Sequence, residues 1–176
     1  MQEARLKKSN QLTNPPVKLY LQIVNSFANL ILHRHLSLST NIIDRINVAL
    51  ALPNLRILSM GRNNLKKIEK LEGVAGTLEE LWCSYNQISS LDGLENLSKL
   101  TTLYMSNNRL RDFDELRKIA GLSALKDVLF VGNPMYDGGL TPTQQRVEVL
   151  KRLPNLVKID GEMVKPSERE EAEAAA

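Results

Sequence analysis

Apolar and polar residues follow a pattern along most of the chain that recurs every 22 to 25 residues. Each unit reads L-x-x-L-x-L-x-x-N-x-L, with apolar residues at positions 1, 4, 6 and 11 and asparagine at position 9. The alternation within L-x-L predicts a short strand whose apolar side faces a core. In units two to five the predicted core residues are Leu55, Leu58, Met60, Leu65, Leu78, Leu81, Cys83, Ile88, Leu100, Leu103, Met105, Leu110, Leu125, Val128, Phe130 and Met135.

The position-9 asparagines set the spacing of the units, and a period of about 20–29 residues with this pattern is typical of leucine-rich repeats. We therefore expect one α/β leucine-rich-repeat solenoid, with a short parallel sheet on the concave face, helices on the convex face and helical caps. The asparagines are expected to satisfy buried backbone groups where the chain leaves each strand. This predicted ladder consists of Asn41, Asn63, Asn86, Asn108 and Asn133.

Both ends of the array need caps, because a repeat buries its apolar face only against its neighbours. We expect an N-terminal extension and capping helix over 1–35, the repeats with a C-terminal cap over 36–165, and a short helical tail over 166–176. The cap helix is expected to begin at Thr141-Pro142, and Ser167-Glu168-Arg169-Glu170 has a capping-box pattern. The apolar stripe that predicts the N-terminal helix consists of Leu19, Ile23, Phe27, Leu30 and Ile31.

Composition favours a single soluble domain, since 43% of the 176 residues are hydrophobic and 24% are charged. No apolar run is long enough to span a membrane, and the N-terminus lacks a signal-peptide core. With Cys83 as the sole cysteine, we expect an intracellular, reducing location and no disulfide. The first 76 residues carry a charge of +7 and the rest −4, a gradient that could steer a partner or simply reflect solvated faces.

Catalytic and cofactor chemistry finds no support in the sequence. The only histidines, His33 and His35, fit the edge of a terminal repeat better than a metal site, and Cys83 falls at a core position. No glycine-rich phosphate-binding loop is present, and Glu79-Glu80 shows no acid-base arrangement. We therefore expect no enzyme, no cofactor and no bound metal.

The repeat register also predicts the outward surface, because positions 3 and 5 of each strand must point away from the core. At position 5, Trp82, Tyr104 and Leu129 fall on adjacent strands and should form one exposed stripe. Trp and Tyr with a charged rim are typical of binding hot spots. The other candidate partner-binding residues on and around this surface are Arg56, Ile57, Arg62, Glu80, Tyr85, Thr102, Asn107 and Asp127.

Two other interpretations of the stripe stay open from the residues alone. Trp82 could pack across its own sheet as a structural lid. Aromatic residues near basic ones also serve nucleic-acid binding, but Glu79, Glu80 and Asp127 would repel phosphate. We therefore expect a protein partner, with neither nucleic acid nor membrane.

The segment Thr77-Leu-Glu-Glu-Leu-Trp-Cys-Ser-Tyr-Asn-Gln-Ile88 is specific beyond a generic repeat. With 36–41, 54–64, 103–108, 152–156 and Asp160-Gly161, it gives a resemblance, over about residues 36–171, to the leucine-rich-repeat light chains of outer-arm axonemal dynein. The resemblance implies a non-catalytic, monomeric subunit of a larger complex in the axoneme of a cilium or flagellum. Its implied partner is a dynein heavy chain at the microtubule-binding stalk, and tubulin is a further candidate.

The resemblance also implies that the C-terminal helix contacts the motor, with Arg169 as the candidate residue. Two alternatives are kept on the repeat class alone. The chain could be a leucine-rich-repeat regulatory subunit of a protein phosphatase, or a scaffold within a ribonucleoprotein. The fold by itself does not decide among the three.

Overall fold

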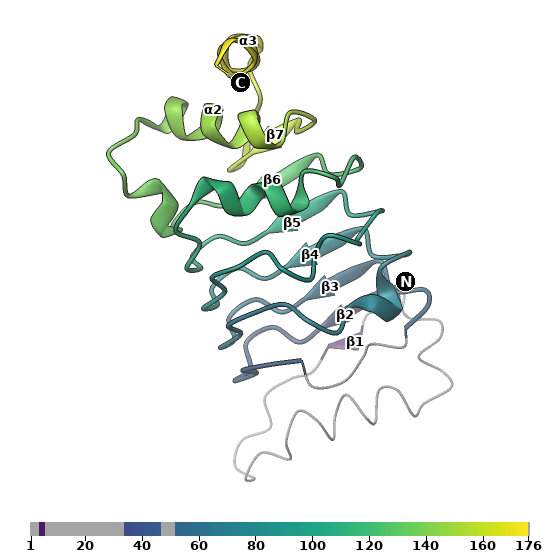
Figure 1. The fold of residues 1–176 in the computed structure, drawn as a ribbon. Helices are drawn as coiled ribbons and strands as arrows, with labels where there is room; N and C mark the ends of the chain where they lie inside the picture. The colour runs from purple at the N-terminus through teal and green to yellow at the C-terminus, as the bar shows by residue number, and fades with distance from the viewer. Residues whose placement is uncertain (1–3, 6–33, 47–51, 176) are drawn as a thin grey trace.

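The chain forms a stack of short strands joined by turns and return segments (Figure 1). The computed structural model describes residues 4–5, 34–46 and 52–175. One sheet runs in the order β1 to β8, with neighbours parallel as far as β7 and the last pair antiparallel. The strands are β1 Ala4–Arg5, β2 His35–Ser37, β3 Ile57–Ser59, β4 Glu80–Trp82, β5 Thr102–Tyr104, β6 Asp127–Leu129, β7 Lys158–Ile159 and β8 Glu162–Met163.

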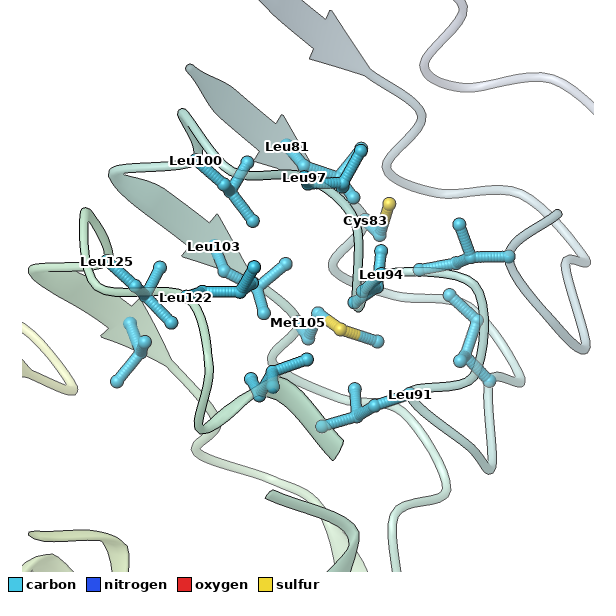
Figure 2. Close-up of a cluster of buried hydrophobic side chains, with 14 of the residues drawn as sticks. Leu81, Cys83, Leu91, Leu94, Leu97, Leu100, Leu103, Met105, Leu122 and Leu125 are labelled. Atoms are coloured by element: carbon cyan, nitrogen blue, oxygen red, sulfur yellow. The ribbon is translucent and has the colours of Figure 1, made fainter. Parts of the chain in front are cut away.

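The strand register is the one that the repeat pattern predicts. Leu58 pairs with Leu81, and Leu81 pairs with Leu103, so each repeat position lies beside the same position of the next repeat. These leucines are fully buried, as is Cys83, and burial raises the pKa of the Cys83 thiol. Figure 2 shows the buried side chains gathered between the strands and the return segments. The α/β leucine-rich-repeat solenoid is confirmed.

The inner asparagines bond to the backbone of their own and the preceding repeat, as expected of a ladder. Asn86 donates from Nδ2 to the carbonyl oxygens of Met60 (3.0 Å) and Cys83 (2.9 Å), and its Oδ1 accepts from the Leu65 amide (3.0 Å). Buried Asn63, Asn108 and Asn133 make the equivalent bonds between repeats. Asn41 differs, because it is exposed and, among the residues that the structure describes, its side chain bonds to the carbonyls of Leu38 and Ser39 in its own repeat.

The return segments on the convex face are shorter and tighter than the expected helices. They contain turns and the 3-10 helices η2 Glu72–Val74, η3 Phe113–Ile119 and η4 Pro134–Tyr136. In the third repeat, Leu94 and Leu97 each donate a backbone bond to the leucine three residues earlier. This spacing of three matches the 3-10 period, so a short return buries its leucines without an α-helix.

The C-terminal cap begins where the sequence predicts it. Helix α2, Pro142–Arg152, has Thr141 as its N-cap, and Thr141 and Gln144 form a reciprocal capping box. The tail is helix α3, Pro166–Ala174, which begins one residue before Ser167. The predicted capping box at Ser167 is wrong, because Lys165 is the N-cap and Glu168 Oε2 accepts from the Lys165 amide (2.9 Å).

Helix α3 lies on α2 and is seen end-on in Figure 1. A buried ion pair joins the helices, with Arg146 7% and Glu168 3% exposed. Arg146 donates from Nε and Nη2 to the two carboxylate oxygens of Glu168, at 2.7 and 2.9 Å. Its guanidinium also donates to the carbonyls of Ile159 and Met163, so one side chain ties α2, α3 and the β7–β8 hairpin together.

The predicted N-terminal capping helix lies outside the described residues, as does His33. Within the described part of 1–35, β1 extends the sheet beyond β2 by pairing Ala4 with Leu36. None of the helices in the described ranges is both long and apolar enough to cross a membrane.

Candidate protein-binding surface

The aromatic stripe consists of Trp82, Tyr104 and Leu129 at matching positions of β4, β5 and β6. The rings of Trp82 and Tyr104 are stacked, with centroids 6.3 Å apart and planes 19° from parallel. All three side chains are half-buried rather than fully exposed as predicted. The difference arises because strands about 4.8 Å apart bring large neighbouring side chains into contact, so each covers part of the next.

Carboxylates at position 3 hold both rings in place. The Trp82 indole Nε1 donates to Glu80 Oε2 (3.1 Å), and the Tyr104 hydroxyl donates to Asp127 Oδ2 (2.9 Å). Desolvation by burial, followed by this bond to Asp127, raises the pKa of Tyr104 and keeps its hydroxyl protonated as a donor. The stripe is therefore ordered before any partner arrives.

The N-terminal end of the stripe continues into the first two repeats. The His35 ring meets Trp82 edge-on, with centroids 5.8 Å apart and planes at 71°. Ile57 lies between His35 and Glu80 in the position-3 row. Two buried polar atoms in the described chain, His35 Nε2 and Asp127 Oδ1, have no hydrogen-bond partner, and each lies at one end of this row.

The turns after the strands place a second set of candidates at the edge of the sheet. Arg62, Tyr85 and Asn107 all have positive φ, between 53° and 59°, which turns their side chains away from the core. The Arg62 guanidinium lies 4.5 Å from the Tyr85 ring centroid, a cation–π contact, and Tyr85 is 50% exposed. The equivalent Gly132 also has positive φ (77°), and a Cβ there would lie 2.6 Å from Asn107 Oδ1, so a substitution would require the Asn107 side chain to move.

Arg56 and Thr102 complete the predicted surface. Arg56 is exposed just before β3 and forms an ion pair with Glu79 just before β4. Thr102 lies between Glu80 and Asp127 in the position-3 row. The structure thus brings the predicted residues of repeats two to five onto one face and its adjoining edges.

Arg169 is separate from this face. Its guanidinium donates to the carbonyls of Pro154 and Leu156, the latter at 2.8 Å, and it helps to fix α3 on the cap. The residue is half-buried and already bonded within its own chain. The role of Arg169 as a contact with the motor, which the family resemblance implies, stays a prediction.

Lys158 extends the position-3 row beyond Asp127, to which its ammonium group is bonded at 3.3 Å. Lys158 is not among the predicted surface residues, because the outward positions were assigned only for the five repeats that carry an asparagine at position 9. The phrase Leu-Pro-Asn-Leu, at 52–55 and again at 153–156, placed the two segments in one register and could have identified it. The Arg146–Glu168 ion pair was also not predicted, because α2 and α3 lie outside the repeats and the repeat pattern gives no information about contacts between them.

Comparison with known proteins agrees with the geometry. A profile described as Leucine Rich repeats (2 copies) matches residues 77–118, which include Trp82 and Tyr104. Dynein axonemal light chain 1 of Chlamydomonas reinhardtii is 52% identical over 145 residues, covering 81% of this chain and 73% of the relative. The chain belongs to the dynein axonemal light chain 1 family.

Two vertebrate members of the family are matched over more of the chain. The Danio rerio protein is 44% identical, and the match covers 96% of this chain and 90% of that protein. The Homo sapiens protein is 45% identical, and the match covers 89% of this chain and 81% of that protein. Among solved structures, the Drosophila melanogaster SNF/U2A′ complex aligns with a TM-score of 0.72 over 88% of this chain and 89% of that one. At 22% identity this likeness supports the fold alone.

The described residues include no cluster of side chains suited to a metal ion. Across residues 34–46 and 52–175, His, Cys, Asp and Glu side chains form no group of three or more that could hold an ion. The carboxylates nearest the stripe, Glu80 and Asp127, are used as hydrogen-bond acceptors for the aromatic residues. This face therefore presents aromatic rings that are held in place by acidic side chains.

Proposed function

We propose that this chain is a non-catalytic light chain of outer-arm axonemal dynein. In this proposal it binds a dynein heavy chain near the microtubule-binding stalk and regulates how the motor engages microtubules in the axoneme of a cilium or flagellum. It acts as a monomeric subunit of the larger complex, and tubulin is a further candidate partner. Membership of the dynein axonemal light chain 1 family supports this function over the phosphatase and ribonucleoprotein alternatives.

The observation that carries the proposal is the fixed Trp82–Tyr104 pair. Both rings are held by carboxylates before binding, so docking a partner on them costs little side-chain entropy. Large aromatic residues of this kind, surrounded by polar groups, supply most of the affinity in protein interfaces. The aromatic stripe is accordingly the proposed heavy-chain site.

The charges of the surface favour a protein partner that brings hydrogen-bond donors. Glu80 and Asp127 flank the rings, and Asp127 Oδ1 has no partner within the described chain. That oxygen has almost no accessible surface, so a lysine, arginine or amide of the heavy chain would pair with the half-buried Glu80 carboxylate, whereas a phosphate backbone would be repelled. The expected contact is therefore an apolar segment with an adjacent basic or amide side chain.

The proposal is tested by replacing both rings, Trp82→Ala with Tyr104→Ala, and measuring affinity for a recombinant heavy-chain fragment that contains the stalk tip. We expect at least about a hundredfold loss of affinity, because paired hot-spot residues each contribute about 2 kcal/mol or more. Circular dichroism should show an intact fold.

A matched control removes apolar surface elsewhere. Ile42→Ala with Met163→Ala changes two side chains that are 63% and 61% exposed and that lie off the stripe. This variant should bind the heavy-chain fragment with the affinity of the wild type. Equal affinities of the control and the Trp82/Tyr104 variant would show that the heavy chain binds another surface.

A further inference from the structure

A second polar surface lies beyond the asparagine turns, on the flank where the chain passes from the sheet to the convex face. We call it the basic flank; it is an open groove lined by Lys66, Gln87, Ser89, Arg109 and Arg111. These residues occupy positions 10 and 12 of repeats two to four. The groove shares no residue with the aromatic stripe, so both surfaces can be occupied at once.

The backbone of the basic flank is fixed by bonds between repeats. The amides of Gln87 and Arg109 donate to the carbonyls of Leu65 and Ile88, each at 2.8 Å. The ladder asparagines bind the Leu65 and Ile88 amides from the inner side. The side chains of the flank therefore project from a rigid frame at a spacing set by the repeats.

Three cations share this groove without a carboxylate to balance them. Within the described chain, Lys66, Arg109 and Arg111 form no ion pair, whereas Lys118, Arg152 and Lys158 are all paired. The neighbouring Asp112 forms no ion pair with Arg111; its carboxylate caps η3 by accepting from the Asp114 amide (2.8 Å). Asp44, at position 12 of the first repeat, makes no ion pair with Lys66.

We propose that the basic flank binds an acidic segment of a partner protein. Lys66 and Arg111 occupy the same position two repeats apart, a separation of about 10 Å at the usual strand spacing. One small anion cannot span that distance, but about three residues of extended chain can. Carboxylates of the segment pair with the cations, and Gln87 and Ser89, between them, bond its backbone.

A peptide fits the groove better than a nucleic acid does. Single-stranded nucleic acids gain much of their affinity by stacking bases on aromatic side chains. The residues that line the groove include no aromatic ring, and the rings of Trp82 and Tyr104 lie on the concave face. Charge pairing with amide and hydroxyl support is what an acidic peptide requires.

The test uses the full chain and fluorescence anisotropy with a labelled oligoglutamate peptide, the matching oligoglutamine peptide and oligothymidylate. Wild type should bind oligoglutamate in a salt-sensitive manner and should not bind oligoglutamine. The variant Lys66→Ser/Arg109→Ser/Arg111→Ser should bind oligoglutamate at least about tenfold more weakly, because the cations that pair with its carboxylates are gone. Unchanged thermal unfolding would show that the variant is folded.

The matched control, Lys70→Asn/Lys99→Ser/Arg117→Ser, removes the same number of exposed positive charges from outside the groove. It should retain nearly the wild-type affinity for oligoglutamate. The proposal is overturned if both variants lose affinity equally, if wild type does not bind oligoglutamate, or if oligothymidylate binds more tightly through the same three residues. No heavy chain is present in this assay, so its result is independent of the proposed function.

Discussion

At the scale of single residues, two asparagines of one pattern have different roles. Asn86 is buried and joins the backbones of two repeats through Met60, Leu65 and Cys83, whereas Asn41 is exposed and, among the described residues, bonds to carbonyls of its own repeat. The repeat pattern predicted the same role for both. Their different burial depends on how each rung packs against the rest of the array, which the local sequence does not encode.

The first residue-scale prediction compares Asn86→Ala with Asn41→Ala. Loss of the Asn86 amide leaves the buried Leu65 N–H without an acceptor and takes one of two asparagine donors from the carbonyls of Met60 and Cys83, so the unfolding free energy should fall by about 1–3 kcal/mol. For a chain of this size that corresponds to several degrees in Tm. Asn41→Ala should change Tm little in differential scanning calorimetry. Equal effects would contradict the assignment of buried and exposed rungs.

At the scale of elements, the sequence predicted the strands and their register, which repeat, but not the side-chain contacts that occur at one place only. The register of β2 to β7 follows from period and alternation, so Trp82 and Tyr104 could be placed side by side before any coordinates. Their partial burial could not, because it depends on ring stacking and on Glu80 and Asp127 as acceptors. The N-cap of α3 was misplaced at Ser167, because Pro166 in the first turn and the Glu168 carboxylate, which accepts from the Lys165 amide, make Lys165 the N-cap.

The Arg146–Glu168 pair leads to a prediction about how α3 is attached. Glu168→Ala leaves Arg146 buried without its counter-ion, a situation that costs about 3–5 kcal/mol in other proteins. Amide hydrogen exchange in α3 and the β7–β8 hairpin should rise strongly. The control Glu170→Ala removes an exposed carboxylate from the same helix and should leave exchange unchanged. Normal protection of α3 in Glu168→Ala would show that the pair does not hold the helix.

The same pair makes the attachment of α3 dependent on pH. The hydrogen bond from Arg146 lowers the pKa of Glu168 in the folded state from its ordinary value of 4.5. A carboxyl with a lowered folded-state pKa stabilises fully above its unfolded pKa and loses that stabilisation as pH falls through the folded value. The protection of α3 amides, measured relative to the exchange rate of an unfolded chain at the same pH, should thus fall below about pH 4.5 in the wild type. This acid-dependent loss of protection should be absent from Glu168→Gln.

At the scale of the whole molecule, the repeats form a one-dimensional array in which each contacts chiefly its neighbours. Its two proposed surfaces, the aromatic stripe and the basic flank, lie on opposite sides of the asparagine ladder and draw on the same central repeats. A destabilising substitution at one end of such an array should loosen only that end, whereas one in the central repeats should affect both surfaces. Cys83, buried in the third repeat, is a natural probe of this distinction.

Thiol labelling of Cys83 tests how far disorder spreads along the array. In the folded wild type the thiol should react slowly, because it is fully buried and burial raises its pKa. Leu103→Ala, in the adjacent strand, should speed labelling greatly, since removing a buried leucine costs about 2–5 kcal/mol. Glu168→Ala should loosen α3 yet leave Cys83 almost as slow as in the wild type. If Cys83 reacts in step with the exchange of α3 amides, the repeats unfold as one unit and the stripe depends directly on the C-terminal cap.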